Sequence, residues 1–596
     1  MQVSRKTRNE LVLLMLVSAL IRALLAGWIE LGTDEAYYWT FAKYPDWSHF
    51  DHPGMIGWII QLFSLNLLYD SEFFLRLSSV VIMTLNTWIM FRIGKELKDE
   101  ATGLRAALLY TTSIYAFVIT GIFILPDTPL SLFWLLAFWM AVRYLGSPTL
   151  TLQGITTTVG NNRYLILFGL FAGLSMLSKY SGVFLWVGMG LYMLCYDRRQ
   201  FKNPSLYLAL FISALCCLPI LVWNIQNDFI SFRFHGGRVG LTGTLTPGNF
   251  SNELSGEFLY NNPVNFIIAI LALIAVRRHR LPLDPSRQRL IMLTALPMIG
   301  LFLVFSIYRP TLPHWSGPAY NLLIFPSALW LGTTKSNRRK KLIIASIVTW
   351  ALVVLVGTME IKTGFVPLDH NTEARSLGKD DITLDLYGWR QLGTKFADFR
   401  AEQIEKGVMK ETDGIIGNNW FPTANLDYYV ARPLHMDVLG YGPLERIHKY
   451  LWINEKRGGF VLNADYWYLA DSHFFIDPEK AYAYTNFKEI RLLGTIPIER
   501  NGKVVRNIFV YQCHHLVYIP ETLETENGKR KTNQLKNNIL WKNYWTNSCA
   551  MLPWRRPRTK PPKRNHPQRK NSICCVCSAM NCSRWASRQR WTNTAT

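Results

Sequence analysis

The loop after the first apolar segment gathers side chains that can carry out acid–base chemistry. Asp34 and Glu35 stand directly after that segment, and His49, Asp51 and His52 follow in the same loop. Carboxylates beside a membrane are costly unless they face water or take part in chemistry. A carboxylate there can accept the proton of an attacking hydroxyl group, and cationic side chains can hold a phosphate. The pattern therefore predicts a reaction centre for an anionic substrate beside a membrane.

The elements that position this loop are membrane helices. Residues 11 to about 360 form successive apolar runs, whereas the residues from about 361 onward are mixed and polar. Runs of roughly 17–25 apolar residues are typical of membrane helices. The first run is too long for the apolar core of a signal peptide and lacks a small-residue cleavage site. We expect it to remain as a helix.

Basic loops set the orientation, because cytoplasmic loops are rich in Lys and Arg. With the basic residues that precede the first helix in the cytoplasm, that helix carries Asp34 to the outer face. The apolar residues 53–69 then lie along the outer interface, since a crossing there would put the basic cluster at residues 92–105 outside. The other strong basic clusters also fall on the cytoplasmic side.

Lys179 interrupts the long apolar run at residues 164–196. A charged residue at membrane depth is costly unless it is paired or functional, so we expect two short helices that meet near Lys179. The alternation then predicts an α-helical polytopic membrane protein of about eleven spans. Its transmembrane domain is expected at residues 1–360, with a cytoplasmic N-terminus and the long C-terminal portion outside.

The outer loops then hold acids and cations together. Such a set suits transfer from a lipid-linked sugar phosphate, because the acceptor hydroxyl needs a base and the leaving phosphate needs cations. Asp34 is the expected base, cations such as Lys179, His52 and Arg309 can clamp the phosphate, and residues 53–69 can hold the lipid chain. The candidate residues are Asp34, Glu35, Asp127, His52, Lys179, His235, Arg238, Tyr308, Arg309 and His314.

Each of these residues also has a purely structural interpretation. Asp34 can be ordinary loop polarity, and Asp127 can cap the helix that follows it. Lys179 can extend its ammonium group to the interface, and His235 beside two glycines can belong to a turn. The residues alone leave these alternatives open.

Six motifs occur in a fixed order along the chain. They are "TDEAYYW", "FDHPG", "LPDTPL", "SMLSKYSGVF", "WNIQNDFISFRFHGGR" and "LPHWSGPAYNLL". In this order they resemble the bacterial GT-C glycosyltransferases, close to the dolichyl-phosphate-mannose protein mannosyltransferase superfamily and its aminoarabinose and lipopolysaccharide-core transferase relatives. Each motif is weak by itself, but the ordered series is specific and covers roughly residues 10–430.

The resemblance implies an inverting hexosyl or pentosyl transfer from a polyprenyl-phosphate sugar, undecaprenyl in bacteria, at the periplasmic face of the inner membrane. It matches Asp34, with Glu35 beside it, to an essential acid, and Asp127 to a second acid. It matches Lys179 to a lysine near the phosphate. Relatives often have Lys-Pro-Pro or His-Pro-Pro where this chain has His-Pro-Gly, so the phosphate contact of His52 depends on an altered turn.

The acceptor is expected to be a hydroxyl group on an envelope glycolipid, polysaccharide or protein. No cofactor is implied and no tight ligand cluster demands a metal, although a divalent metal is left open. The alternative from another class is a lipid-linked sugar transporter or flippase. A flippase needs a polar path through the bilayer, whereas the charges here gather on one face. A ligase or polymerase with a diphosphate-linked donor is a further alternative.

The chain after the last apolar run divides into two parts. Residues 361–515 alternate helical and strand patterns, which predicts a small periplasmic α/β domain that selects the acceptor or forms a lid. The predicted elements are a helix at 386–407 and short strands at 413–419, 435–440, 458–465 and 507–513.

Residues 516–596 are basic and have no periodicity. The residues after Glu526 hold 16 Lys and Arg, no acid and five of the nine cysteines. Without them the net charge of +23 falls to about +7, so the total charge does not indicate a nucleic-acid partner. The composition predicts disorder. It also resembles translation in a shifted frame, and the spacing of its cysteines is poor for zinc.

Overall fold

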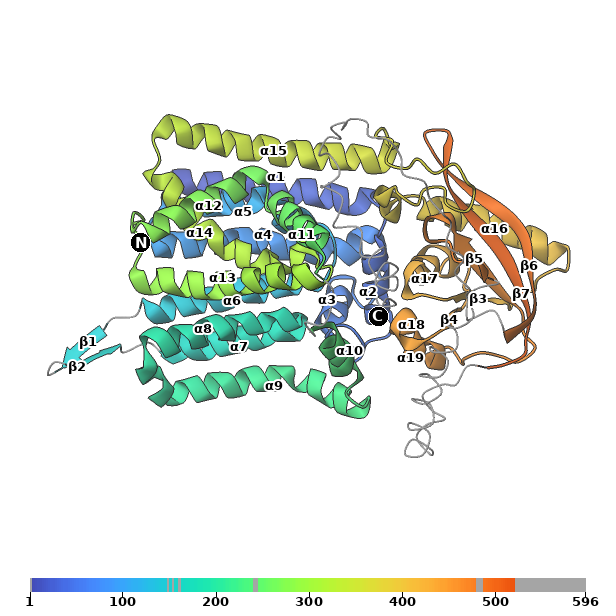
Figure 1. Cartoon of the computed structure of the whole chain (residues 1–596), viewed down its shortest axis with the longest axis horizontal. Helices are drawn as coiled ribbons and strands as arrows, with labels where there is room; N and C mark the ends of the chain where they lie inside the picture. Colours follow the sequence, from blue (N-terminus) through green and yellow to red (C-terminus); the bar gives the residue numbers. More distant parts are fainter. Residues whose placement is uncertain are drawn as a thin grey trace, which may run out of the picture.

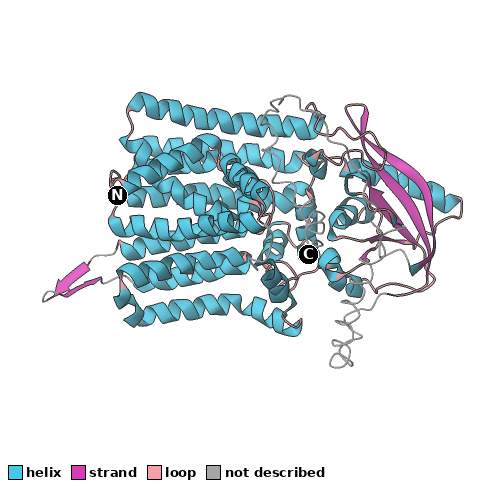
Figure 2. Ribbon diagram, viewed as in Figure 1, coloured by secondary structure: helices cyan, strands magenta, loops and turns pink. Residues whose placement is uncertain are grey.

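The computed structural model describes residues 3–519, apart from 147–148, 153–154, 159–161, 240–244 and 479–485. A bundle of roughly parallel helices carries an α/β unit on one end (Figures 1 and 2). The helices that run along the bundle are α1 (Arg5–Trp28), α4 (Glu72–Leu97), α5 (Glu100–Thr112), α6 (Asp127–Leu145), α7 (Asn162–Ser178), α8 (Phe184–Tyr196), α9 (Pro204–Gln226), α12 (Pro263–Arg277), α13 (Pro285–Tyr308), α14 (Gly317–Thr333) and α15 (Ser336–Thr363).

The outer surface of the bundle is apolar, as in a protein surrounded by lipid. Only 6% of the most apolar window of α15 is buried, and only 22% of that of α1, although both windows are strongly hydrophobic. A water-soluble helix with so little burial would carry polar residues on its open face. The chain is therefore a multi-pass membrane protein.

Fewer helices are long enough to span a membrane than run along the bundle. Six helices among the described residues are long and apolar enough to cross a membrane, or seven if a pair of helices bent by 99° is one span. That pair is α11 (Pro247–Tyr260) and α12. Each of the eleven predicted spans corresponds to a helix, but several are shorter than a full crossing. The count of eleven stays a prediction.

Short elements gather at the end of the bundle that faces the α/β unit (Figure 1). Residues 53–69 form only the nine-residue helix α3 (Met55–Phe63), in agreement with an interfacial segment. The helix is interrupted at Lys179, between α7 and α8, as predicted. The chain then continues as the 3-10 turn η2 (Tyr180–Val183). The other short elements there are α2 (Thr33–Lys43), η1 (Tyr115–Ile119), α10 (Ile230–Val239) and η4 (Pro313–Ser316).

The opposite end of the bundle carries the N-terminus and a hairpin of β1 (Thr149–Leu152) and β2 (Ile155–Thr158) (Figure 1). The two ends of the bundle thus differ in what they present. One end has the N-terminus and the β1–β2 hairpin, and the other has the loops that hold the predicted acids. The basic tail predicted at residues 516–596 lies outside the described residues from residue 520 onward.

The α/β unit is built on one five-stranded sheet in the order β4-β3-β5-β7-β6. β3 pairs in parallel with β4 and β5, and β7 runs antiparallel to β5 and β6. The strands are β3 (Gly414–Gly417), β4 (Val438–Gly440), β5 (Tyr466–Asp471), β6 (Phe487–Arg500) and β7 (Lys503–Leu516). The helical elements are η5 (Ile382–Leu386), α16 (Trp389–Glu405), α17 (Trp420–Leu426), η6 (Asp427–Ala431), α18 (Leu444–Ile447), α19 (Tyr450–Lys456) and η7 (Ser472–Phe474).

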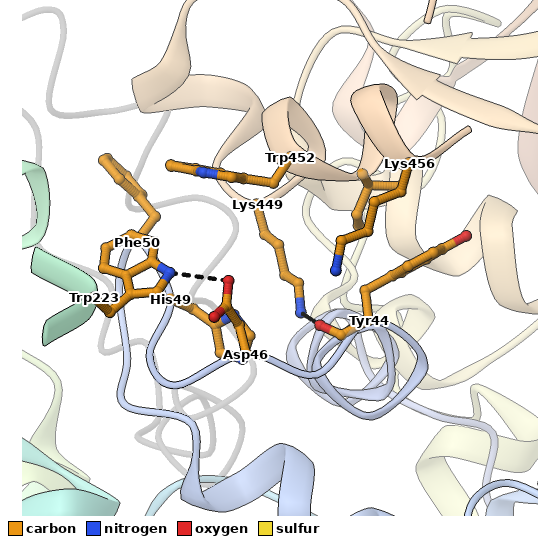
Figure 3. Close-up of a pocket in the computed structure, with 9 residues that line it drawn as sticks. Tyr44, Asp46, His49, Phe50, Trp223, Lys449, Trp452 and Lys456 are labelled. Atoms are coloured by element: carbon orange, nitrogen blue, oxygen red, sulfur yellow. Dashed lines mark hydrogen bonds between the residues drawn. The ribbon is translucent and has the colours of Figure 1, made fainter. Parts of the chain in front are cut away.

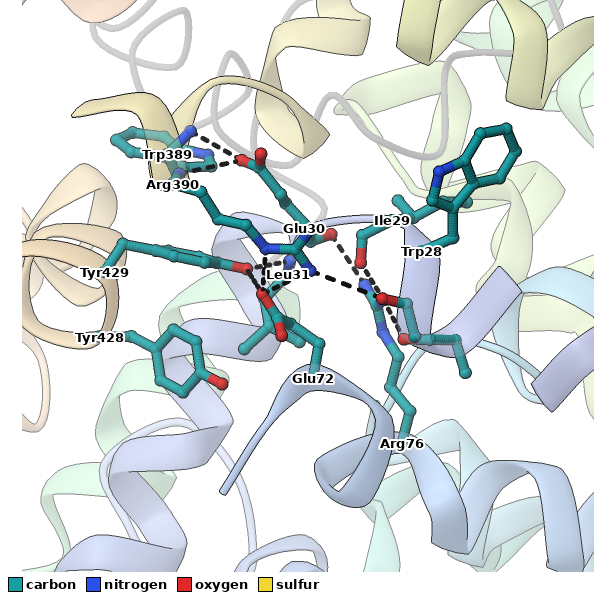
Figure 4. A network of polar contacts seen from close by, with 12 residues as sticks. Trp28, Ile29, Glu30, Leu31, Glu72, Arg76, Trp389, Arg390, Tyr428 and Tyr429 are labelled. Atoms are coloured by element: carbon teal, nitrogen blue, oxygen red, sulfur yellow. Dashed lines mark hydrogen bonds and ion pairs between the residues drawn. The ribbon is translucent and has the colours of Figure 1, made fainter. Parts of the chain in front are cut away.

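A polar network fastens the α/β unit to the end of α1 (Figure 4). The Glu30 carboxylate accepts the backbone N–H of Trp389 at 2.6 Å. The Arg390 guanidinium donates to Glu72 at 2.8 Å, and the Tyr429 hydroxyl donates to the same carboxylate oxygen at 3.2 Å. These bonds join α4 and the loop after α1 to α16 and η6, so they fix the position of the α/β unit on the bundle.

Candidate functional site

A cleft lies where the N-terminus of α2 meets the loop after η1, the turn η4 and the turn η5. It contains about 460 Å³ of open space, and we call it the Asp34 cleft. Asp34 is half-buried in its wall. The lining residues are Gly32, Thr33, Asp34, Glu35, Ile119, Phe123, Leu125, His314, Asp385 and Leu386.

Glu35 fixes the start of α2 and has no free oxygen left for a substrate. One of its oxygens accepts the Gly32 N–H at 2.9 Å, and the other accepts the Ile124 N–H at 3.0 Å. Both oxygens also bind the buried guanidinium of Arg76. We therefore interpret Glu35 as a positioning residue, although the sequence predicts it as a catalytic acid together with Asp34.

Arg76 connects this corner to the end of α1 (Figure 4). Its guanidinium donates to the backbone carbonyls of Ala26 at 3.0 Å, Ile29 at 2.6 Å and Glu30 at 2.9 Å. These carbonyls lie at the C-terminal end of a helix, where a cation is favourable. The pair of Glu35 and Arg76 thus holds Asp34 in a fixed position relative to the first span.

Replacing Glu35 by Gln is expected to lower the free energy of unfolding by about 3–5 kcal/mol, because it leaves the Arg76 charge buried without its partner. The measurement is a thermal or denaturant unfolding curve of the purified protein in detergent. The matched control is Glu402→Gln, which removes an exposed ion pair with Lys406 and should cost no more than about 0.5 kcal/mol. Equal losses in the two variants would contradict the assigned role of Glu35.

The second predicted acid, Asp127, forms a buried ion pair with Lys179. The ammonium of Lys179 donates to Asp127 at 2.7 Å, and the side chains are 13% and 3% exposed. The Tyr115 hydroxyl lies 3.4 Å from the other oxygen of Asp127. Asp127 is the first residue of α6, and the capping residue Pro126 makes no side-chain cap bond. The Asp127 carboxylate is therefore the partner of Lys179, and Asp127 is not the capping residue of α6.

His314 connects the Asp34 cleft with this ion pair. It lines the cleft from η4. Burial lowers its pKa to about 4, with Asp127 opposing and Lys179 adding to the shift. His314 is therefore neutral near pH 7. It can bind a phosphate only through a ring N–H, and not as the cation that the sequence suggested.

The remaining predicted residues with described side chains do not line the Asp34 cleft. The His235 ring nitrogen Nε2 is 2.8 Å from the Asp51 carbonyl oxygen, and the His52 ring packs on Tyr38 with 5.7 Å between ring centres. Tyr308 ends α13, and Arg309 follows it. The side chain of Arg238 lies outside the described residues.

A joint with the α/β unit holds the other end of α2 (Figure 3). The ammonium of Lys449 donates to the carbonyls of Thr40 at 3.0 Å and Tyr44 at 2.6 Å. The Trp223 indole N–H donates to Asp46 at 3.0 Å. Burial lowers the pKa of Lys449 well below its usual range. Because its donors bind the carbonyls at a helix C-terminus, we interpret this joint as support for α2 and not as a reaction centre.

Asp385 is a cleft residue that the sequence reasoning missed. It lines the Asp34 cleft from η5, and its carboxylate lies 3.2 Å from Nε2 of His473. The other ring nitrogen of His473 is 2.5 Å from the carbonyl oxygen of Gly378. Burial raises the pKa of Asp385. Burial also opposes a charged His473, but its bond to Asp385, the charges of Asp385 and Asp471 and the Gly378 carbonyl together outweigh burial and raise the pKa of His473. The sequence signal that could have indicated Asp385 is a single acid between two apolar residues, Leu384 and Leu386.

An apolar cavity adjoins the Asp34 cleft on the membrane side. It contains about 680 Å³ of open space between α1, η1 and α15. Ile119 and Phe123 line both the cavity and the cleft, so an apolar chain in one can continue to a headgroup in the other. Residues 53–69, predicted to hold the lipid chain, do not line this cavity.

Comparisons with known proteins agree with this arrangement. Residues 51–223 match the family described as dolichyl-phosphate-mannose-protein mannosyltransferase. The lipid A galacturonosyltransferase RgtD of Rhizobium johnstonii is 22% identical over 293 residues. That match covers 48% of this chain and 58% of the length of RgtD.

Solved structures share the fold at low sequence identity. The crystal structure of ArnT from Cupriavidus metallidurans in the apo state has a TM-score of 0.53 and 12% identity, and the match covers 86% of this chain and 99% of ArnT. The structure of the same protein bound to undecaprenyl phosphate has a TM-score of 0.52. Residues 51–223 are thus similar to the dolichyl-phosphate-mannose-protein mannosyltransferase family, and the chain shares the fold of the ArnT structures.

Proposed function

We propose that this protein transfers a sugar from a polyprenyl-phosphate donor to an acceptor hydroxyl at the periplasmic face of the inner membrane, with inversion at the sugar. The main support is the juxtaposition at one end of the bundle. A cleft with a half-buried acid and an apolar cavity share Ile119 and Phe123 there. The buried lysine–aspartate pair interacts electrostatically with His314 in the wall of the cleft. The acid suits the acceptor hydroxyl, the lysine of the ion pair suits the donor phosphate, and the cavity suits the lipid chain of the donor.

In this reaction the acceptor oxygen attacks the sugar carbon that carries the phosphate. A carbon–oxygen bond forms, the bond from that carbon to the phosphate oxygen breaks, and Asp34 takes the hydroxyl proton. Lys179 stabilises the negative charge that develops on the phosphate, while Asp127 holds the lysine in place. The roles of His52, His235, Arg238, Tyr308 and Arg309 in holding the donor stay predictions.

The names of the relatives suggest the substrates. RgtD is described as acting on lipid A, and one ArnT structure contains undecaprenyl phosphate. We propose an undecaprenyl-type donor and an acceptor in the envelope. Lipid A or a related glycolipid is the preferred candidate for the acceptor, and a polysaccharide or protein is the second. The apolar cavity beside the cleft supports a lipid-linked donor, because it offers open space lined mainly by aliphatic side chains.

The proposed orientation places the N-terminus in the cytoplasm and the α/β unit in the periplasm. It rests on the basic residues at the end of the bundle away from the α/β unit. Arg92 and Lys95 lie in the last turns of α4, and the basic run at 338–341 lies in the first turns of α15. Cytoplasmic loops carry such an excess of Lys and Arg.

The competing function from another class is a lipid-linked sugar flippase. Vesicles that contain the purified protein and a polyprenyl-phosphate sugar, but no acceptor, separate the two functions. The proposed enzyme leaves the sugar lipid in its original leaflet until an acceptor is added, and then transfers the sugar. Movement of the sugar lipid across the vesicle without acceptor would favour the flippase.

Asp385 is proposed to bind the acceptor from the α/β side of the cleft. Asp385→Asn is then expected to raise KM for the acceptor about 10- to 100-fold, because one hydrogen bond to a charged group is lost. KM for the donor should stay unchanged. Steady-state kinetics with each substrate varied in turn provides the measurement.

His473 acts through Asp385, which gives a second readout. His473→Gln should raise the acceptor KM in the native chain but not in the Asp385→Asn background, since the two residues form one unit. Additive effects in the double variant would show that His473 does not act through Asp385. Equal changes in donor and acceptor KM would overturn the role of Asp385 itself.

A further inference from the structure

We propose that the α/β unit binds one Zn²⁺ ion through Asp465, His514 and His515. One potential ligand atom from each side chain lies within 4.8 Å of the other two, in a group that stands apart from the Asp34 cleft. Two imidazoles and a carboxylate form a ligand set that zinc prefers, whereas magnesium and calcium prefer oxygen ligands alone. This site is independent of the proposed transfer reaction.

The sheet register brings the three side chains together. β5 and β7 are antiparallel neighbours, with Tyr466 opposite Cys513, so Asp465 and His514 lie opposite each other at the next position. Nδ1 of His514 is 2.9 Å from one oxygen of Asp465, and Nδ1 of His515 is 4.0 Å from the other. The carboxylate thus stands between the two rings.

An unusual backbone conformation turns both histidines to the same side. Successive side chains of a strand point to opposite faces, so His515 would normally follow Cys513 into the core. His515 instead has a φ of 56°, and the two imidazole rings lie 4.7 Å apart. A left-handed conformation is strained for a residue other than glycine. The Asp465 carboxylate accepts the backbone N–H of His515 at 2.9 Å and so holds this turn.

Two further features fit a metal site. Nδ1 of His515 is buried without a hydrogen-bond partner among the described residues. The amide of Gln512 donates to Asp465 at 2.8 Å, which orients the carboxylate as a supporting group does around a bound metal. The side chains of Asp465, His514 and His515 are 17%, 32% and 43% exposed, which leaves room for a water molecule as a fourth ligand.

The position indicates a structural role. Asp465 precedes β5 and His473 follows it, so the proposed zinc site and the Asp385–His473 pair are separated by at least the length of that strand, about 20 Å. A zinc ion there would join the start of β5 to the end of β7. It would stabilise the sheet without taking part in the chemistry at the cleft.

The test uses the full-length protein in detergent, stripped of metal with a chelator and then loaded with one equivalent of Zn²⁺. Bound zinc per chain and the Tm are measured for the native chain and for His514→Ala/His515→Ala. We expect the double variant to bind one ion fewer and to lose the rise in Tm that zinc gives the native chain. Asp465→Asn should bind zinc at least tenfold more weakly and serves if the double variant fails to fold.

Two controls separate this site from other ligands in the chain. His370→Ala/His435→Ala removes two exposed histidines from the same part of the chain and should leave zinc binding unchanged. Cys574→Ser/Cys575→Ser/Cys577→Ser tests the cysteines of the tail. Equal zinc content in the native chain and in His514→Ala/His515→Ala would overturn the proposal, as would loss of the ion in the tail variant alone.

Discussion

Replacing Asp34 by Asn is expected to lower kcat for sugar transfer by about 10²- to 10⁴-fold, the usual contribution of a general base. Asp34 is the half-buried acid in the wall of the cleft, and the bonds of Glu35 to Gly32 and Arg76 fix its position. Asparagine has nearly the same size but cannot accept the proton. The donor KM should change little, because the proposed contact with the lipid phosphate comes from Lys179 and not from Asp34.

The measurement is steady-state transfer in vesicles that contain the purified protein, the lipid-linked donor and the acceptor. Asp46→Asn is the matched control. Asp46 follows the C-terminal end of α2, whereas Asp34 lies at its N-terminal end. The Asp46 carboxylate accepts a hydrogen bond from the Trp223 indole. We expect the control to retain kcat within about threefold, since surface substitutions away from a site have small effects. Undiminished transfer by Asp34→Asn would remove Asp34 from the reaction.

The second large effect is expected from Lys179. Lys179→Met should lower kcat about 10²- to 10³-fold, the loss that follows removal of one group that stabilises transition-state charge. It should also destabilise the fold by about 3–5 kcal/mol, because the buried Asp127 carboxylate loses its partner. The two effects have different causes and can be separated.

The double variant Asp127→Asn/Lys179→Met separates them. Removing both charges should restore most of the lost stability, because no buried charge is left unpaired. It should not restore kcat, because the cation that faces the phosphate is still absent. Unfolding curves and transfer rates of the two single variants and the double variant complete the cycle. Recovery of kcat together with stability would make Lys179 a purely structural residue.

The membrane part of the fold could be predicted from local signals. The cost of a charge at membrane depth predicted the break at Lys179, and it lies between α7 and α8. The positive-inside pattern predicted that residues 53–69 do not cross, and they form the short helix α3. Both predictions depend only on whether a segment lies in lipid or in water, and the polarity of its own residues indicates which.

Contacts between distant segments could not be predicted in this way. Asp127 and Lys179 are 52 positions apart, and hydrophobic periodicity carries no information about which of the outer loops meet. Asp385 joins the cleft from beyond the last span, and only the docking of the α/β unit on Glu30 and Glu72 brings it there. The predicted acids were therefore found singly, without their partners.

The α/β unit shows where pattern reading succeeds and fails. The helix predicted at 386–407 is α16, and the strands at 413–419, 435–440 and 507–513 correspond to β3, β4 and β7. The strand predicted at 458–465 is wrong. Gly458, Gly459 and Asn463 have φ values of 84°, 73° and 62°, far from the extended values of a regular strand, and β5 begins only at Tyr466. β6 was missed because its exposed and buried residues do not alternate regularly.

The most direct test of the account measures both products of the reaction at once. The purified protein in vesicles receives polyprenyl-phosphate hexoses and pentoses, their diphosphate counterparts, and envelope glycolipid as acceptor. Released polyprenyl phosphate and transferred sugar are counted for the native chain and for Asp34→Asn. The account predicts equal amounts of the two products, from a monophosphate donor only, with both lost in the variant. Transfer from a diphosphate donor at the same rate, or equal product formation by Asp34→Asn, would contradict it.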